Sequence, residues 1–191
     1  SLSLDHALMA YGGAVNRIEG LFAGFNVLEI RQAEARIANS VFQFNGDGSM
    51  LTQQGPLNRF GRGQNGPAVI FVTNSQPVII NNSIYQNETS DGLSNSGAIS
   101  INANSLTHRL VTDRGRSTGF ADALSGFEDN AGPLIFDNNL QDNNINGMIV
   151  RGETLTTQGI WDDHSIVHVL FDQVIVDDLH SFGGLRLQSS I

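Results

Sequence analysis

The chain has 191 residues, of which 40% are hydrophobic and only 15% charged, so it is too apolar for a disordered segment and long enough for one sizeable core. Its formal net charge is −9, with ten arginines and no lysine, which argues against nucleic acid or an anionic membrane as a partner. The lack of lysine excludes Schiff-base chemistry, and the lack of cysteine excludes disulfides, thiolate metal sites and cysteine nucleophiles. No apolar run approaches the roughly 18 residues that span a bilayer, so no membrane insertion is expected.

Short apolar segments repeat along the chain, beginning at residue 27. Residues 27–45 align with residues 69–87 without a gap, and residues 133–143 form a third copy. Three aligned apolar positions are Ile37, Ile79 and Ile135. If the strands of successive copies stack in register, about 4.8 Å apart, these side chains form one interior column.

Asparagine and aspartate recur at the turn positions of the same copies. One set is Asn39, Asn81 and Asp137, and another is Asn45, Asn87 and Asn143. In stacked coils, equivalent amide side chains hydrogen-bond to one another and form ladders. An ordinary β-sandwich with asparagines in its surface turns is the alternative.

Further short apolar runs, rich in β-branched residues, lie between and after these copies, at 68–72, 98–102, 148–152, 166–171, 173–176 and 184–188. Runs of about five residues are typical of strands and too short for helices. Between 166 and 171, alternation predicts that Val167, Val169 and Phe171 are buried and that His168 faces outward. The sequence therefore predicts an all-β fold, a right-handed parallel β-helix (solenoid) that forms one domain over residues 1–191.

The repeated pattern, I-x-N-N-x-[IL]-x-x-N followed by a glycine-led apolar strand, is fullest at 77–102 and 133–152. It resembles the parallel β-helix repeats of the pectin-lyase-like superfold. The later stretch GMIVRGETLTTQGIW is similar to segments of very large secreted β-helical proteins of aquatic bacteria such as planctomycetes. This second resemblance implies an extracellular or cell-surface setting and supplies no catalytic residue. The start of the chain lacks the features of a signal peptide, so we expect a fragment of a larger protein whose targeting segment lies elsewhere.

Two long insertions interrupt the predicted coils, at 46–66 and at 103–132. In a β-helix such excursions leave the turns and border a groove along one lateral face, where a ligand can meet the solenoid. The alternative is that both are tolerated surface loops, because long loops add little entropic cost.

The first insertion begins with a candidate calcium loop. Asn45 and Asp47 are separated by one residue in the sequence N-G-D-G-S, so their side-chain oxygens could converge on a hard cation. The pattern lacks the bidentate glutamate and the full spacing of an EF-hand, and a plain glycine turn is the alternative. No other cofactor is expected, and none is required.

Two polar clusters are candidates for catalysis. Asp162, Asp163 and His164 could hold a metal or share acid–base work, although a solvated strand edge is the favoured interpretation. The other cluster is the only basic one in the sequence: Arg109, Asp113, Arg114 and Arg116. An arginine beside acidic residues suits a polysaccharide lyase, but an acidic chain repels polyuronate, and these arginines could simply pair with nearby carboxylates.

The sequence favours a structural or adhesive module that displays other domains or binds a surface ligand, either a polysaccharide or another surface protein. We also expect either that the parent protein continues past Ile191 or that the chain associates end to end, because the open ends of a solenoid expose strand edges. The alternative is a polysaccharide lyase or glycoside hydrolase that acts in a groove on the β-helix face. Whether the chain is an enzyme stays open, although the lack of a convergent catalytic set favours a protein without catalytic activity.

Overall fold

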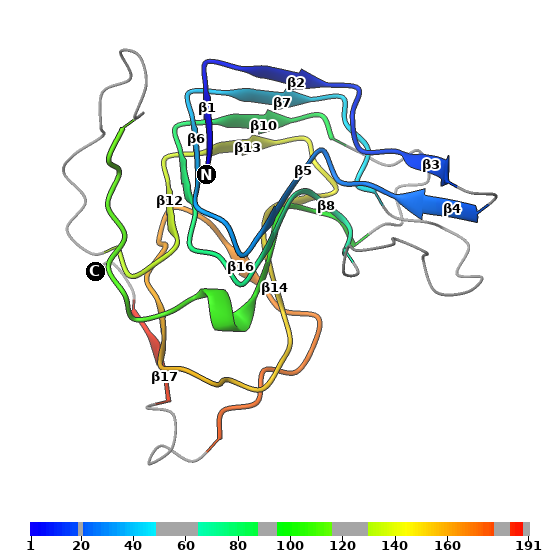
Figure 1. Ribbon diagram of the computed structural model, residues 1–191. Helices are drawn as coiled ribbons and strands as arrows, with labels where there is room; N and C mark the ends of the chain where they lie inside the picture. Colours follow the sequence, from blue (N-terminus) through cyan, green and yellow to red (C-terminus); the bar gives the residue numbers. More distant parts are fainter. Residues whose placement is uncertain (19–20, 49–64, 88–94, 116–129, 178–183, 189–191) are drawn as a thin grey trace.

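The computed structural model describes residues 1–18, 21–48, 65–87, 95–115, 130–177 and 184–188 (Figure 1). The chain forms a right-handed parallel β-helix in which three parallel sheets surround one core. Sheet 1 contains β1 (Leu2–Asp5), β6 (Ala35–Ala38), β9 (Val78–Ile80) and β12 (Leu134–Phe136). Sheet 2 contains β2 (Leu8–Ala10), β7 (Val41–Gln43), β10 (Ser83–Tyr85) and β13 (Asn139–Gln141). Sheet 3 contains β5 (Leu28–Arg31), β8 (Ala68–Thr73), β11 (Gly97–Asn102), β14 (Ile145–Arg151) and β16 (His168–Val169).

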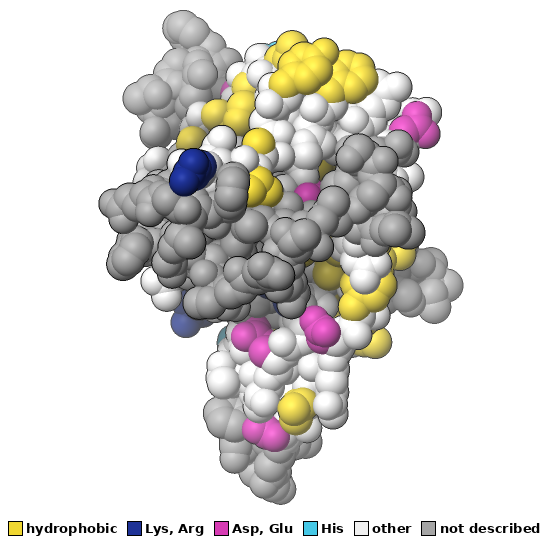
Figure 2. All heavy atoms as spheres, turned by 90° about the vertical axis from the view of Figure 1, so that its right-hand side faces the viewer, with side chains coloured by type: hydrophobic (Ala, Val, Ile, Leu, Met, Phe, Trp, Pro, Cys, Tyr) yellow, Lys and Arg dark blue, Asp and Glu magenta, His cyan; other side chains and the backbone are white. Residues whose placement is uncertain are grey.

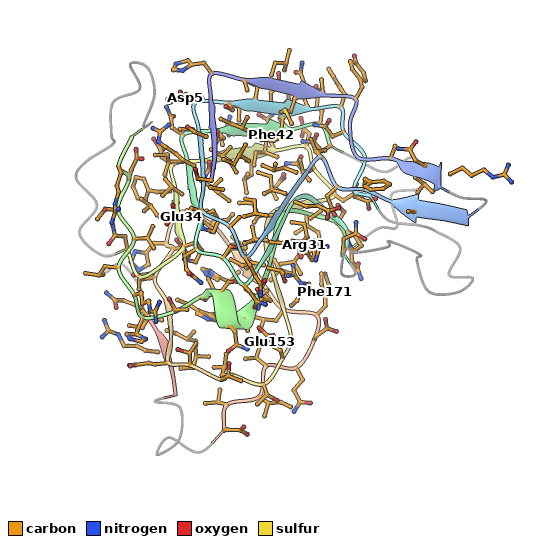
Figure 3. The ribbon with its side chains drawn as sticks, viewed as in Figure 1. Asp5, Arg31, Glu34, Phe42, Glu153 and Phe171 are labelled. Atoms are coloured by element: carbon orange, nitrogen blue, oxygen red, sulfur yellow. The ribbon has the colours of Figure 1, made fainter. Side chains whose placement is uncertain are left out.

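The interior column predicted from the repeat is confirmed. Ile37 of β6 is the register partner of Ile79 in β9, which in turn is the partner of Ile135 in β12. All three side chains are buried in one hydrophobic cluster, together with Phe42 from sheet 2, which lies inside the coils in Figure 3. The ladders between these strands are parallel, which excludes the β-sandwich alternative. The one antiparallel strand pair in the described residues is β3 (Val15–Ile18) with β4 (Leu21–Gly24), outside the coils.

The corners of the coils are built by residues in the left-handed region. Between sheets 1 and 2, Asn39, Asn81 and Asp137 have φ of 51°, 53° and 53°, a conformation that Asn and Asp tolerate because their short side chains can hydrogen-bond locally. Each of these residues turns the chain into the next strand within two positions. The Asn and Asp spacing in the sequence therefore marks corners, as predicted.

Buried amide ladders run parallel to the core. The backbone N–H of Asn45 and its Nδ2 both donate to Asn87 Oδ1, at 3.0 and 2.9 Å, and Asn87 Nδ2 donates to Asn143 Oδ1 at 2.8 Å. A further ladder, not predicted, links Ser40 N to Asn82 Oδ1 and Asn82 Nδ2 to Asn138 Oδ1. These bonds supply partners for corner backbone groups that no strand can pair.

Two glycines lie in contact where the β3–β4 hairpin and the 46–66 insertion leave adjacent coils. A Cβ on Gly13, where φ is +70°, would lie 2.1 Å from the carbonyl oxygen of Gly46, and a Cβ on Gly46 would lie 2.1 Å from that of Gly13. Only glycine permits this backbone approach. It fixes the start of the 46–66 insertion; residues 49–64 of that insertion lie outside the described part of the chain.

The second insertion begins at the corner between sheets 3 and 1 with a single 3-10 turn, η1 (Ala103–Ser105). Its described ends pair through an antiparallel bridge between Leu110 and Ala131. Val111 then packs against the outward-facing apolar side chains of sheet 1, among them Ile80 and Leu134. Strands β6 and β9 are therefore buried on both faces, which explains the continuous apolar run of β9, whereas β1 stays partly exposed.

The last coil crosses beneath the core from sheet 1 to sheet 3. After β15 (Gly159–Trp161), which pairs with β17 (Leu185–Leu187), the chain passes directly from the edge of sheet 1 to the edge of sheet 3. His168 is the register partner of Met148, and its ring stacks on Trp161 with centroids 5.5 Å apart. The prediction for this run is therefore wrong: His168 faces the interior, whereas Val167 and Phe171 are 65% and 51% exposed. Within the described part of the chain, no helix has the length and hydropathy needed to span a membrane.

Candidate functional site

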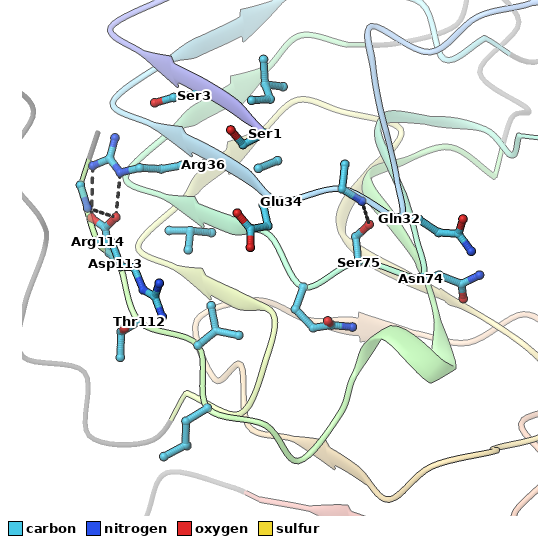
Figure 4. A pocket seen from close by; sticks show the side chains of 18 residues that line it. Ser1, Ser3, Gln32, Glu34, Arg36, Asn74, Ser75, Thr112, Asp113 and Arg114 are labelled. Carbon is cyan, nitrogen blue, oxygen red and sulfur yellow. Dashed lines mark hydrogen bonds and ion pairs between the residues drawn. The ribbon is translucent and has the colours of Figure 1, made fainter. Parts of the chain in front are cut away.

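A groove of about 760 Å³ lies between the outer edge of sheet 1 and the segment 110–115, which we call the strap (Figure 4). The strap forms one wall, and the turns that precede β6 and β9 form the other. Most side chains that enter the groove are polar and small or flexible. Four of them bear on function: Ser3, Glu34, Asp113 and Arg114.

The strap is held on the coils by a buried ion pair. Arg36, on the outer face of β6, donates to both carboxylate oxygens of Asp113, from Nε at 2.7 Å and from Nη2 at 3.1 Å. Its Nη1 donates to Asp5 of the preceding coil at 2.6 Å. The hydrogen bond to Asp113 raises the pKa of Arg36, and this outweighs the opposing effect of burial. Burial raises the pKa of Asp5, but hydrogen bonds from Asn39 and Arg36 lower it below the usual value overall.

The predicted basic cluster is only partly brought together. Asp113 is buried in the ion pair, and Arg114 is exposed and lines the groove. Arg109 is exposed, and its carbonyl oxygen accepts a hydrogen bond from Gly132 N at 2.6 Å. Arg116 lies outside the described residues. Sequence reasoning missed Arg36, whose signal is a single charge within the apolar run A-R-I-A.

Asp162 and Asp163 cap backbone groups at the end of the insertion and of sheet 1. Asp162 Oδ2 accepts from Ala131 N at 2.7 Å, and Asp163 Oδ1 accepts from Ile135 N at 3.0 Å. Both residues are buried, so the solvated strand edge does not describe them. Burial raises the pKa of Asp163 well above its usual value, the hydrogen bond from Ile135 lowers it, and nearby Asp162 raises it again.

His164 does not complete a catalytic set with these carboxylates. It is exposed, and its Nε2 lies 3.0 Å from the carbonyl oxygen of Gln188. The three neighbours in sequence thus have three separate structural contacts.

The candidate calcium ligands are also engaged in the fold. Asn45 Oδ1 accepts from Gly12 N at 2.8 Å, and Asn45 Nδ2 donates to Met9 O and to Asn87 within the ladder. Asp47 is 5% exposed, and its carbonyl oxygen accepts from Asn26 Nδ2 and Ala68 N. Among the residues that the structure describes, no group of three or more His, Cys, Asp or Glu side chains is arranged to hold a metal ion.

Two arginines that are distant in sequence lie close together on the outer face of sheet 3. The guanidinium carbons of Arg151 and Arg31 lie 4.0 and 4.7 Å from the centroid of the Phe71 ring. Burial lowers the pKa of Arg151 to about 10, while nearby Glu153 raises it and Arg31 lowers it. Arg151 also donates to Ser100 and to the carbonyl oxygen of Val72, so this group stabilises the sheet. No protein-family model, curated protein or solved structure matches this chain.

Proposed function

We propose that this chain is a structural and adhesive β-helical module of an extracellular or cell-surface protein, which binds a surface ligand, most simply a polysaccharide, without altering it chemically. The solenoid provides a stiff rod whose rungs share one core and continuous amide ladders. Insertions at its corners then provide the binding surfaces.

The observation that carries the proposal is the state of the carboxylates in the groove. Glu34 and Asp113 are the two acidic residues among those that line it. Asp113 is held in the buried ion pair with Arg36, so it lacks the freedom to act as an acid or a nucleophile. Glycoside hydrolysis needs two carboxyl groups on either side of the scissile bond, and the described groove offers only Glu34 for that task.

The alternative, a lyase or hydrolase, draws its support from Glu34 and Arg114 on the walls of the same groove. The two functions separate in one experiment. The purified chain is incubated with a panel of neutral and acidic polysaccharides, with and without calcium, and both retention on the polysaccharide and release of reducing ends are measured.

We expect retention on at least one polysaccharide and no released product with any of them. Ser3→Trp, which fills the groove, and Glu34→Gln serve as the matched variants. Product release by the wild-type chain that Glu34→Gln reduces by about a hundredfold or more would contradict the proposal, since that is the size of a lost acid–base catalyst. Failure to bind any member of the panel would remove the adhesive part of it.

The proposal includes self-association through one end of the rod. Within the described strands, β1, β2 and β5 have a parallel partner on one side only, so a further coil or a second copy of this chain could pair with them. At the other end, residues 162–169 pass beneath the core and interrupt the three-sheet pattern. Self-association is therefore proposed for the end formed by β1, β2 and β5.

A further inference from the structure

The outer face of sheet 2 carries no charged side chain on its strands, although the chain has 19 acidic residues and 10 arginines. Along these strands Met9, Phe42, Ile84 and Leu140 belong to the core or pack against it, so their neighbours face outward. The outward residues of β7, β10 and β13 are Val41, Gln43, Ser83, Tyr85, Asn139 and Gln141. The strands of this face therefore present amides, hydroxyl groups and apolar surface, and charged residues such as Asp137 and Asp142 lie at its corners.

Two aromatic residues occupy strained positions at the corner beside this face. Tyr11 and Phe44 have φ of 58° and 54°, in the left-handed region that bulky side chains rarely adopt. The equivalent positions in the following coils hold Gln86 and Asp142, so the corner itself does not require an aromatic ring. The corner therefore requires the left-handed backbone in each coil, but it does not require a bulky ring there, and non-glycine residues held in this region cluster at functional sites.

The two rings form one exposed group. Their centroids are 5.7 Å apart and their planes differ by 19°, so they stack on each other along the rod. Tyr11 is 82% exposed and Phe44 is 45% exposed. Figure 2 shows hydrophobic side chains gathered at the top of the molecule, at the level that sheet 2 occupies in Figure 1.

A third aromatic residue lies on the face itself. The hydroxyl group of Tyr85 on β10 donates to Oε1 of Gln43 on β7, which holds the ring across the neighbouring strand. Tyr85 and Gln43 are register partners and both are half-buried. The ring is thus fixed in place before any ligand arrives, so little side-chain entropy is lost on binding.

We infer that the uncharged face of sheet 2, with Tyr11, Phe44 and Tyr85, is a binding surface for a neutral polysaccharide. The inference rests on the proposed adhesive function and names its ligand class and a site separate from the groove. Sugar rings have apolar C–H faces that pack on aromatic rings, and their hydroxyl groups match the donors and acceptors of Gln43, Ser83 and Gln141. A charged polysaccharide would find no opposite charge on these strands, and a polyanion would be repelled by the net charge of −9.

The test compares four forms of the chain on insoluble cellulose and chitin and on a soluble neutral glucan and mannan, with polygalacturonate as the anionic control. Tyr11→Asn and Phe44→Asn, combined in one chain, remove the aromatic group and place a residue that tolerates the left-handed region at each position. Phe171→Asn is the matched control, because Phe171 is 51% exposed elsewhere on the molecule. Ser3→Trp reports on the groove.

We expect the wild-type chain and Phe171→Asn to be retained on a neutral polysaccharide and not on polygalacturonate. The double variant should bind about tenfold or more weakly, the size of effect seen when a central aromatic contact is lost. Its melting temperature should be unchanged or higher, because Asn relieves the backbone strain, and this excludes unfolding as the cause.

Retention of the double variant equal to that of the wild-type chain would overturn the inference. If Ser3→Trp alone abolished binding, the ligand would lie in the groove, which contradicts this inference and leaves the proposed adhesive function intact. Binding to no polysaccharide would contradict both. Concentration-dependent self-association that the double variant abolishes, without polysaccharide binding, would assign the aromatic group to a contact between two copies and would also overturn the inference.

Discussion

Asp163 is a buried carboxyl group whose two oxygen atoms have different surroundings. Oδ1 accepts a hydrogen bond from Ile135 N, whereas Oδ2 has no partner among the described residues. Because burial raises its pKa well above the usual value, the folded state favours the protonated carboxyl group. The charged form therefore lowers the stability of the fold at neutral pH.

Asp163→Asn should raise the free energy of unfolding at pH 7 by about 1–2 kcal/mol, because the amide keeps an acceptor for Ile135 N and removes a buried charge. The folded-state pKa of Asp163 lies above the unfolded value of about 3.9. Its contribution to the free energy of unfolding is therefore fully present below about pH 3.9 and is lost as the pH rises through the folded-state pKa. The gain should therefore be larger at pH 7 than at pH 4 in denaturant titrations. Exposed Asp137→Asn is the control, and a loss of stability for Asp163→Asn at pH 7 would contradict the account.

At this scale the sequence could predict residues whose role depends on spacing alone. The Asn and Asp spacing predicted the corner column of Asn39, Asn81 and Asp137 because left-handed turns recur with the coil. The pairing of Arg36 with Asp113 could not be predicted, since the two residues are 77 positions apart and meet only because the insertion folds over sheet 1. His168 was placed on the wrong face because alternation gives two faces without saying which one meets the core.

The amide ladder is the element that joins one coil to the next at the corner between sheets 2 and 3. Asn87 is 4% exposed, and its Nδ2 donates to the carbonyl oxygens of Phe42 and Tyr85 and to Asn143. Its Oδ1 accepts from the backbone and the side chain of Asn45. One side chain thus satisfies groups in three successive coils.

Asn87→Ala should lower the free energy of unfolding by about 2–4 kcal/mol, because buried donors and acceptors on both sides lose their partner. Gln141→Ala, on the exposed face of β13, is the control and should change stability by about 0.5 kcal/mol or less. Thermal or chemical unfolding measures both. Equal effects for the two variants would show that the ladder contributes nothing beyond an ordinary surface residue.

Among the elements, the runs that became central strands could be predicted, as could the run at 184–188 that forms β17, whereas those at 166–171 and 173–176 could not. The runs at 68–72 and 98–102 correspond to β8 and β11, which have partners on both sides. The run at 166–171 yields only the two-residue β16, because the chain reaches sheet 3 by a shortcut and leaves it again at once. The run at 173–176 forms no strand; Ile175 makes a single bridge to Thr154.

Over the whole molecule, coils of unequal length stack on one core because all variation in length is placed at the corners. Equivalent ladder positions are separated by 33, 42 and 56 residues in successive coils. Lengthening a loop adds little entropic cost, so the strands keep their register while the excursions change. The repeat in the sequence predicted the stacked strands. The packing of each insertion depends on contacts with other coils, so no local sequence pattern could predict it.

The central claim is that residues 56 positions apart lie side by side on adjacent rungs, and a cross-link tests it directly. The chain has no cysteine, so Ser83→Cys with Asn139→Cys introduces one pair on the outer face of sheet 2, at register partners of β10 and β13. Parallel strands place such Cα atoms about 4.8 Å apart, within the range that a disulfide spans. We predict that mild oxidation cross-links this pair readily in the folded chain, whereas Ser83→Cys with Leu140→Cys, which faces the core, cross-links far more slowly. Equal cross-linking of the two pairs, or none in either, would contradict the stacked β-helix on which the proposed functions rest.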